Sequence, residues 1–199
     1  MLLLYEFARA NLQGAYAPVW QRGPKGGFAL GSLGAFLVIE ARSHAEARGA
    51  KPLARLTTVL SERAKIAPGA RQAMLEHMWA AIAPKLRGGE AAIISGATGV
   101  EPATAEERAF LAAHSDVPVR ASGSRIGHGV EPAFPMNVAL AALALSHGKL
   151  FPPGDETGVE RNMEGALAQV VVTSVGIVRG EGMALLEADV SLQVVKVFI

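Results

Sequence analysis

Short uninterrupted runs of apolar residues recur along the chain and predict β-strands. Residues 28–40 are the first of these, and they end in the run Phe36-Leu37-Val38-Ile39. Because this run does not alternate with polar residues, we expect a strand that is buried on both faces, as in the interior of an α/β sheet. The other predicted strands occupy residues 52–60, 91–94, 117–119, 169–178 and 182–198.

Between these strands the apolar residues follow helical spacing instead. Thr104 is expected to cap one helix, with Glu107 three positions later completing a capping box. Residues 134–146 are apolar almost all the way round, which predicts a helix buried on every side. The predicted helices occupy residues 44–48, 68–86, 104–113 and 134–146.

The alternation of strands and helices predicts an α/β fold with a mixed, mostly parallel sheet covered by helices. Neither a repeat nor a linker divides the chain, so residues 1–199 are expected to form a single domain. In such folds the loops that follow the strands carry the chemistry. Two glycine-rich loops take that position here, at residues 95–99 and 122–129.

Composition excludes several classes of function. The net charge of +1 provides no basic surplus for a nucleic-acid backbone. The absence of cysteine excludes disulfides, thiolate metal sites and a cysteine nucleophile within this chain. The first residues lack a secretory pattern, and no apolar stretch reaches the length of a membrane span, so we expect a cytoplasmic protein.

His128 is the candidate chemical group that the pattern itself provides. It follows two glycines and directly precedes the apolar helix, where a neutral imidazole can polarise a substrate carbonyl. The sequence alone favours a plainer interpretation, a loop histidine held by hydrogen bonds to the backbone. Residues 96–99 lack the lysine and spacing of a phosphate-binding loop. The other histidines share no metal-ligand spacing and are expected on solvated helix positions: His44, His77, His114 and His147.

Read together, these segments resemble the C-terminal half of a β-ketoacyl-acyl carrier protein synthase, a condensing enzyme of thiolase-like fold. Residues 27–40 are similar to the family's G-F-x-x-G-E-G-A stretch and the strand after it. Residues 44–50 match the helix that follows. Gly127-His128, with residues 141–153, resembles the second active-site histidine and the buried helix behind it. The resemblance extends from about residue 17 to residue 186 and implies substrates linked to acyl carrier protein, with no cofactor or metal.

The first catalytic positions of that family are not matched by this sequence. The resemblance implies a nucleophilic cysteine in an N-terminal half, which has no counterpart here. It also implies a first histidine within an H-G-T-x-T motif. Aligned through Thr98 and Glu107, that histidine falls on Gly96, and no histidine occurs between His77 and His114. Without its nucleophile, the acyl-enzyme route is closed to this chain.

Further family positions are altered in the same way. The lysine that precedes Ser124 falls on Gly123. The closing G-F-G-G-x-N loop falls on residues 176–181, so that its phenylalanine becomes Ile177 and its asparagine Glu181. Only His128 remains of the catalytic set that the resemblance implies.

These departures suggest a ketosynthase-like protein of fatty-acid or polyketide elongation that does not condense by itself. We expect it to act as a chain-length-factor type of partner, bound to a ketosynthase subunit or to the missing N-terminal half, with acyl carrier protein as a further partner. One alternative is a fragment of an active condensing acyltransferase with a rearranged site around His128. Another is a module that serves only for dimerisation or interaction.

Two features favour an oligomer. An all-apolar helix at residues 134–145 leaves a large apolar surface unless another chain covers it. The alternation within residues 190–199 suggests an edge strand that pairs with a neighbour.

Overall fold

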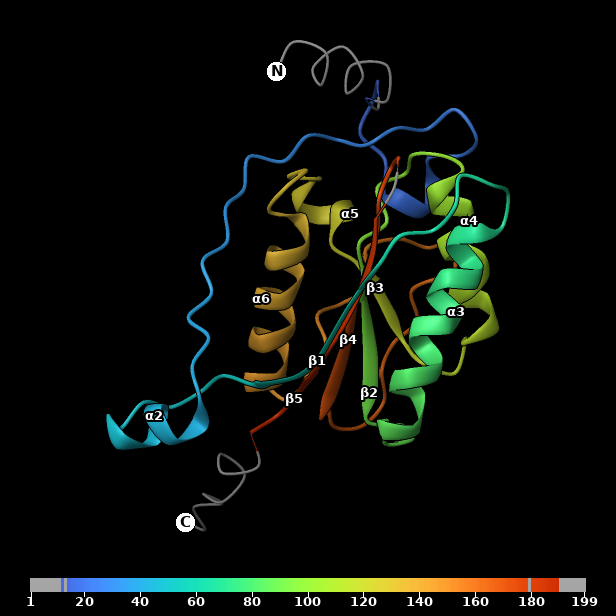
Figure 1. Cartoon of the computed structure of the whole chain (residues 1–199). Helices are drawn as coiled ribbons and strands as arrows, with labels where there is room; N and C mark the ends of the chain where they lie inside the picture. Colours follow the sequence, from blue (N-terminus) through green and yellow to red (C-terminus); the bar gives the residue numbers. More distant parts are fainter. Residues whose placement is uncertain (1–11, 13, 179, 190–199) are drawn as a thin grey trace.

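The computed structural model describes residues 12, 14–178 and 180–189 (Figure 1). Its centre is a five-stranded sheet in the order β1-β5-β4-β2-β3. Strands β2, β3 and β4 are mutually parallel, and β5 runs antiparallel to both β4 and β1. Four of the five strands therefore point the same way, as expected. The strands are β1 (Arg55–Glu62), β2 (Ala91–Ser95), β3 (Val119–Ala121), β4 (Gln169–Val175) and β5 (Glu181–Glu187).

Helices cover both faces of this sheet (Figure 1). Helices α3 (Ala70–Ile82) and α4 (Ala103–Ala113) lie on one face, and α6 (Ala133–Ser146) lies on the other. Strand β4 supplies residues to both cores, because Val171 packs on the α3 and α4 side and Val172 on the α6 side. A strand buried on both faces needs apolar residues at consecutive positions. This explains why the inner strands read as continuous apolar runs.

Most of the predicted elements are present with shifted ends. Helix α3 begins after Gly69, whose φ of 75° lies in the left-handed region, and it runs into a 3-10 turn, η2 (Ala83–Lys85). The last two strands form the predicted pair, closed by a hydrogen bond from Gly176 N to Gly180 O of 2.8 Å. The expected edge strand at residues 190–199 lies outside the described residues. The remaining short helices are η1 (Val19–Gln21), α2 (Arg42–Ala47) and α5 (Gly123–Ile126).

The strand predicted at residues 28–40 is not formed. Phe28 is buried, and Leu30 makes a single bridge with His128, but the chain then runs away from the body of the molecule (Figure 1). The side chain of Phe36 is 99% exposed and that of Val38 86% exposed. A strand needs a neighbouring strand for its backbone hydrogen bonds, and none of the described residues provides one here.

Two other expectations are corrected. Helix α4 begins after Pro102, and Thr104 Oγ1 accepts a hydrogen bond from Gly99 N at 2.9 Å rather than capping the helix. Glu107 does not complete a capping box, because its carboxyl group turns into the core. Helix α6 is not buried on every side either, since Leu143 remains 45% exposed on its outer surface.

Candidate functional site

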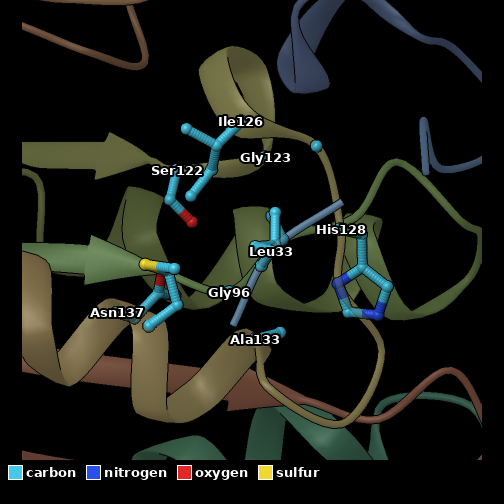
Figure 2. Close-up of a pocket in the computed structure, with 11 residues that line it drawn as sticks. Leu33, Gly96, Ser122, Gly123, Ile126, His128, Ala133 and Asn137 are labelled. Atoms are coloured by element: carbon cyan, nitrogen blue, oxygen red, sulfur yellow. The ribbon is translucent and has the colours of Figure 1, made fainter. Parts of the chain in front are cut away.

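The two loops that the sequence singled out line the same pocket. Residues 95–99 follow β2 and residues 122–129 follow β3. Because β2 and β3 are parallel neighbours, their ends meet at one edge of the sheet. The pocket is a shallow, partly open hollow, and the 250 Å³ of atom-free space around it includes open solvent. Figure 2 shows Leu33 over its middle, with His128 on one side and Asn137 on the other.

His128 is held in this pocket by the segment that precedes the exposed run. Its backbone N donates to Ala29 O at 2.7 Å, and its backbone O accepts from Gly31 N at 3.0 Å. Phe28 packs against the imidazole ring at 5.4 Å between ring centroids, with the rings 67° apart. Gly127 is required before it, because φ is 72° and a Cβ would lie 2.8 Å from Ala29 O. The backbone of His128 is therefore fixed by hydrogen bonds to Ala29 and Gly31, and its ring is packed against Phe28.

The surroundings of His128 favour the neutral form of its imidazole. Burial lowers the pKa of His128 below its usual range, the nearby Arg22 guanidinium lowers it further, and Glu131 partly opposes them. A neutral ring carries one donor and one acceptor nitrogen. His128 can thus donate a hydrogen bond to a carbonyl or accept one, as the sequence interpretation requires. The main chain of His128 is itself hydrogen-bonded on both sides.

Gly96 lies in the same pocket, and its surroundings leave no room for a side chain. A Cβ there would lie 2.7 Å from the backbone O of Thr173 and 3.1 Å from the Cα of Ser174. Both atoms belong to β4, which is paired with β2 on one side and β5 on the other. Any side chain at this position must therefore displace a central strand of the sheet.

Gly123 shows a weaker form of the same restriction. A Cβ would lie 3.0 Å from Ala97 O and 3.1 Å from Val19 Cγ2, so the neighbours would have to give way by a few tenths of an ångström. Of the described residues that line the pocket, His128 is the single titratable side chain (Figure 2). The positions predicted at Gly96, Gly123 and His128 are brought together, and only the last of these carries a functional group.

Ile177 and Glu181 are not part of this pocket. They lie at the turn between β4 and β5, and neither lines the pocket. Glu181 Oε2 instead accepts a hydrogen bond from Ala64 N at 2.7 Å. Arg71 donates to Ile177 O at 3.3 Å and to Val178 O at 3.0 Å, and its Nε lies 4.0 Å from Glu181 Oε1. This buried cluster fixes the turn to α3 rather than to the pocket.

A buried carboxyl group supports the floor of the site. Glu107 Oε1 accepts hydrogen bonds from Ser95 Oγ at 2.8 Å and from Thr173 Oγ1 at 2.6 Å, while Oε2 has no partner among the described residues. Burial raises the pKa of Glu107 strongly enough to outweigh both hydroxyl donors, which lower it. Burial thus shifts the Glu107 carboxyl group towards its protonated form relative to an exposed glutamate, and its hydrogen bonds join α4 to the ends of β2 and β4.

Sequence reasoning missed Arg22, which is the main anchor of the N-terminal segment. Its guanidinium donates to Ala17 O at 2.8 Å, Gly27 O at 3.2 Å, Thr98 O at 2.6 Å and Gly123 O at 3.3 Å. These four carbonyls come from the entry segment and from both pocket loops. The available signal was an arginine within the turn-rich run at residues 22–27.

Asn137 was also missed. It comes from the first turns of α6, and its Nδ2 donates to Ser95 O at 3.3 Å. Its Oδ1 is buried and has no partner among the described residues. The signal was a lone amide within an otherwise apolar helix. Of the histidines expected in solvent, His114 is instead half-buried, 2.8 Å from Glu76 and against the Trp79 ring.

Over residues 12, 14–178 and 180–189, no cluster of three or more histidine and carboxylate side chains is arranged to hold a metal ion. Among the helices in that part of the chain, none has the length and apolar character that a bilayer crossing demands.

Known proteins resemble this chain in structure. No protein-family model matches the sequence, and no curated protein is similar to it in sequence. The ishigamide ketosynthase/chain length factor superposes with a TM-score of 0.74 at 20% identity, over 94% of this chain and 50% of that one. A type II polyketide ketosynthase in complex with its acyl carrier protein gives 0.71 at 16% identity, over 94% and 53%.

A third similar structure is the ketosynthase from module 6 of the bacillaene synthase of Bacillus subtilis 168, with a TM-score of 0.70 at 14% identity, over 94% of this chain and 40% of that one. This chain thus spans about half the length of the first two structures and less of the third. At these identities the likeness concerns the fold. Over nearly its whole length, the chain has the thiolase-like fold of part of a ketosynthase.

Proposed function

We propose that this chain is a ketosynthase-like subunit of fatty-acid or polyketide chain elongation that does not condense by itself. It acts as a partner of the chain-length-factor type, which pairs with an active ketosynthase and helps to shape the site of the growing acyl chain. The fold supports the class of protein. The pocket at the ends of β2 and β3 supports the lack of independent activity.

The observation that carries the proposal is that Gly96 has no room for a side chain. A condensing site of the kind that the resemblance implies needs two imidazoles at the malonyl thioester. Here the pocket holds one imidazole, that of His128. At Gly96, where the second is expected, even a Cβ would lie only 2.7 Å from the backbone O of Thr173 in β4. No thiol exists in the chain to accept an acyl group. Removing a single preorganised donor to a developing oxyanion typically lowers a rate by about 10²–10³-fold.

The proposed partners are a ketosynthase subunit and acyl carrier protein. Among the similar structures, one is named as a ketosynthase/chain length factor and another as a ketosynthase in complex with its acyl carrier protein. This chain spans about half of each, and the proposed partner is either a ketosynthase subunit or the missing N-terminal half of the fold. The cytoplasm is the proposed location for a complex with these partners.

The test is an assay of the purified chain with acyl and malonyl groups on acyl carrier protein. We expect no β-ketoacyl product from this chain alone. Product formed by the chain alone, and lost when His128 is replaced by alanine, would refute the proposal.

That result would favour the second candidate, an active condensing acyltransferase built around His128. The observation in its favour is the geometry of this residue, which places a neutral imidazole in the pocket and holds it from both sides. Under this alternative, the His128→Ala variant loses activity in any complex that contains the chain. Under the leading proposal, a complex with an active ketosynthase retains most of its activity with that variant.

A further inference from the structure

Leu33 lies over the pocket that contains His128, although it comes from the entry segment and not from either pocket loop. Its half-buried side chain lines the pocket together with Gly96, Asn137 and His128. Figure 2 shows it over the middle of the hollow, between His128 and Asn137. The hollow that remains is shallow. One apolar side chain thus occupies the space that a ligand of His128 would need.

Two glycines form a notch that receives this side chain. A Cβ at Gly31 would overlap Leu33 Cδ2, and a Cβ at Gly129 would lie 2.5 Å from Leu33 Cδ1. Real Cβ atoms do not approach other atoms so closely, so neither glycine has room for a side chain while Leu33 is in place. The methyl groups of Leu33 are therefore seated between Gly31 and Gly129 and do not lie loose on the surface.

The segment that carries Leu33 is bound to the backbone of His128 itself. His128 N donates to Ala29 O at 2.7 Å, and Gly31 N donates to His128 O at 3.0 Å. Because Leu33 follows Gly31 by two residues, these bonds hold it at the pocket. The family stretch that residues 27–34 resemble has a glycine at the position of Leu33. The side chain over the pocket is therefore a feature of this chain.

We propose that Leu33 is a plug, which closes the pocket over His128 and keeps small uncharged reagents and ligands from the imidazole. The notch of Gly31 and Gly129 holds the plug in place. The inference rests on the proposed function in one respect, since a plug adds a second barrier to condensation at the same pocket. Its test reads access to His128 and not product, so its failure is distinct from a failure of the catalytic proposal.

Chemical modification of the full chain measures this access. Diethyl pyrocarbonate transfers an ethoxycarbonyl group to a nitrogen of a neutral imidazole, and its other half leaves as ethanol and carbon dioxide. At about pH 8 even an exposed histidine is neutral, so a difference in pKa does not alter the rate. The modified peptides are quantified by mass spectrometry. His44, whose side chain is 71% exposed, provides the reference rate within the same molecule.

Four variants separate a plug from a general loosening of the segment. Leu33→Ala shortens the plug, whereas Leu33→Met keeps a side chain of similar volume. Gly129→Ala leaves Leu33 unchanged and places a Cβ where its Cδ1 now lies, so that the plug is displaced from the notch. Leu30→Ala is the matched control, because Leu30 belongs to the same segment, is 55% exposed and does not line the pocket.

We expect His128 to react about tenfold faster in Leu33→Ala than in the wild type, which corresponds to about 1.4 kcal/mol, roughly the burial energy of a half-buried leucine. Gly129→Ala should give a similar increase. Combining it with Leu33→Ala should add nothing further, because both substitutions remove the same plug. Leu33→Met and Leu30→Ala should remain within about twofold of the wild type.

Modification of His128 as fast as that of His44 in the wild-type chain would overturn the proposal, because the pocket would then be open. Equal rates in Leu33→Ala and Leu30→Ala would overturn it as well. Circular dichroism of each variant ensures that folded chains are compared. A Leu33→Met variant that is folded and reacts as fast as Leu33→Ala would show that the volume of this side chain does not control access, and would equally refute the plug.

Discussion

Replacing Gly96 with alanine tests the packing on which the functional proposal depends. The new Cβ would lie 2.7 Å from Thr173 O, whereas ordinary van der Waals contact begins at 3.4 Å. The neighbour is backbone in a central strand, and the Thr173 side chain is itself bonded to Glu107. Overpacking of this kind costs about 1–3 kcal/mol. For a chain of this size each kcal/mol corresponds to about 2–4 °C in Tm, so we expect a decrease of about 2–12 °C.

The assay is chemical and thermal denaturation followed by circular dichroism, with Gly88→Ala as the matched control. A Cβ at Gly88 meets no atom within 4 Å, so this variant should match or slightly exceed the wild type, by up to about 1 kcal/mol. Equal stability of the two variants would show that the space at Gly96 is open and would refute the packing argument. The same reasoning predicts that Gly96→His is less stable still and gains no condensing activity.

Three further predictions concern the groups around the pocket. Because the pKa of His128 is lowered in the folded state, the unfolded state binds more protons near pH 6. The free energy of unfolding should therefore decrease as the pH is lowered through about 6.5. Denaturation at two pH values should show a smaller decrease for His128→Gln. The raised pKa of Glu107 has the opposite sign, so Glu107→Gln should gain stability relative to the wild type as pH rises above about 4.5; a constant difference across pH would contradict this. Arg71→Met removes the cation beside Glu181 and should lower the free energy of unfolding by about 3–5 kcal/mol, measured by urea denaturation. Hydrogen exchange at the β4–β5 turn should become faster, and unchanged exchange would show that Arg71 does not hold the turn.

The sheet and its covering helices could be predicted from the sequence because the information was local. Strand β4 carries apolar residues on both faces. Helix α3 lies within the helix predicted at residues 68–86, but it ends before Pro84, which has no N–H for a helical hydrogen bond. The two candidate loops could be paired in advance as well, since parallel strands present their ends at one edge. Element ends were less accurate, as for β3, which was expected at residues 117–119 and lies at Val119–Ala121.

The strand at residues 28–40 was wrong for a physical reason. Its apolar pattern describes the environment that the segment requires, but strand formation depends on a neighbour that the described chain does not contain. The prediction for α6 failed in the same way, since Leu143 lacks a covering layer. Both errors concern segments on the same side of the sheet (Figure 1).

Long-range contacts within the site were out of reach. Nothing in the sequence near Gly96 indicates that Thr173, which lies far along the chain, closes the space above it. The same holds for Arg22, whose carbonyl partners come from three separate segments. Glu107 fitted a capping-box pattern, but bonding to two buried hydroxyls prevailed over the local preference.

Decarboxylation of malonyl-acyl carrier protein by the purified chain, followed as a decrease in the mass of the carrier protein, tests whether the pocket is inactive. We expect a rate no higher than that of a reaction without protein. The pocket has one imidazole, that of His128, and the backbone of Thr173 leaves no room for a second one at Gly96. Decarboxylation by the chain alone that disappears in His128→Ala would contradict it.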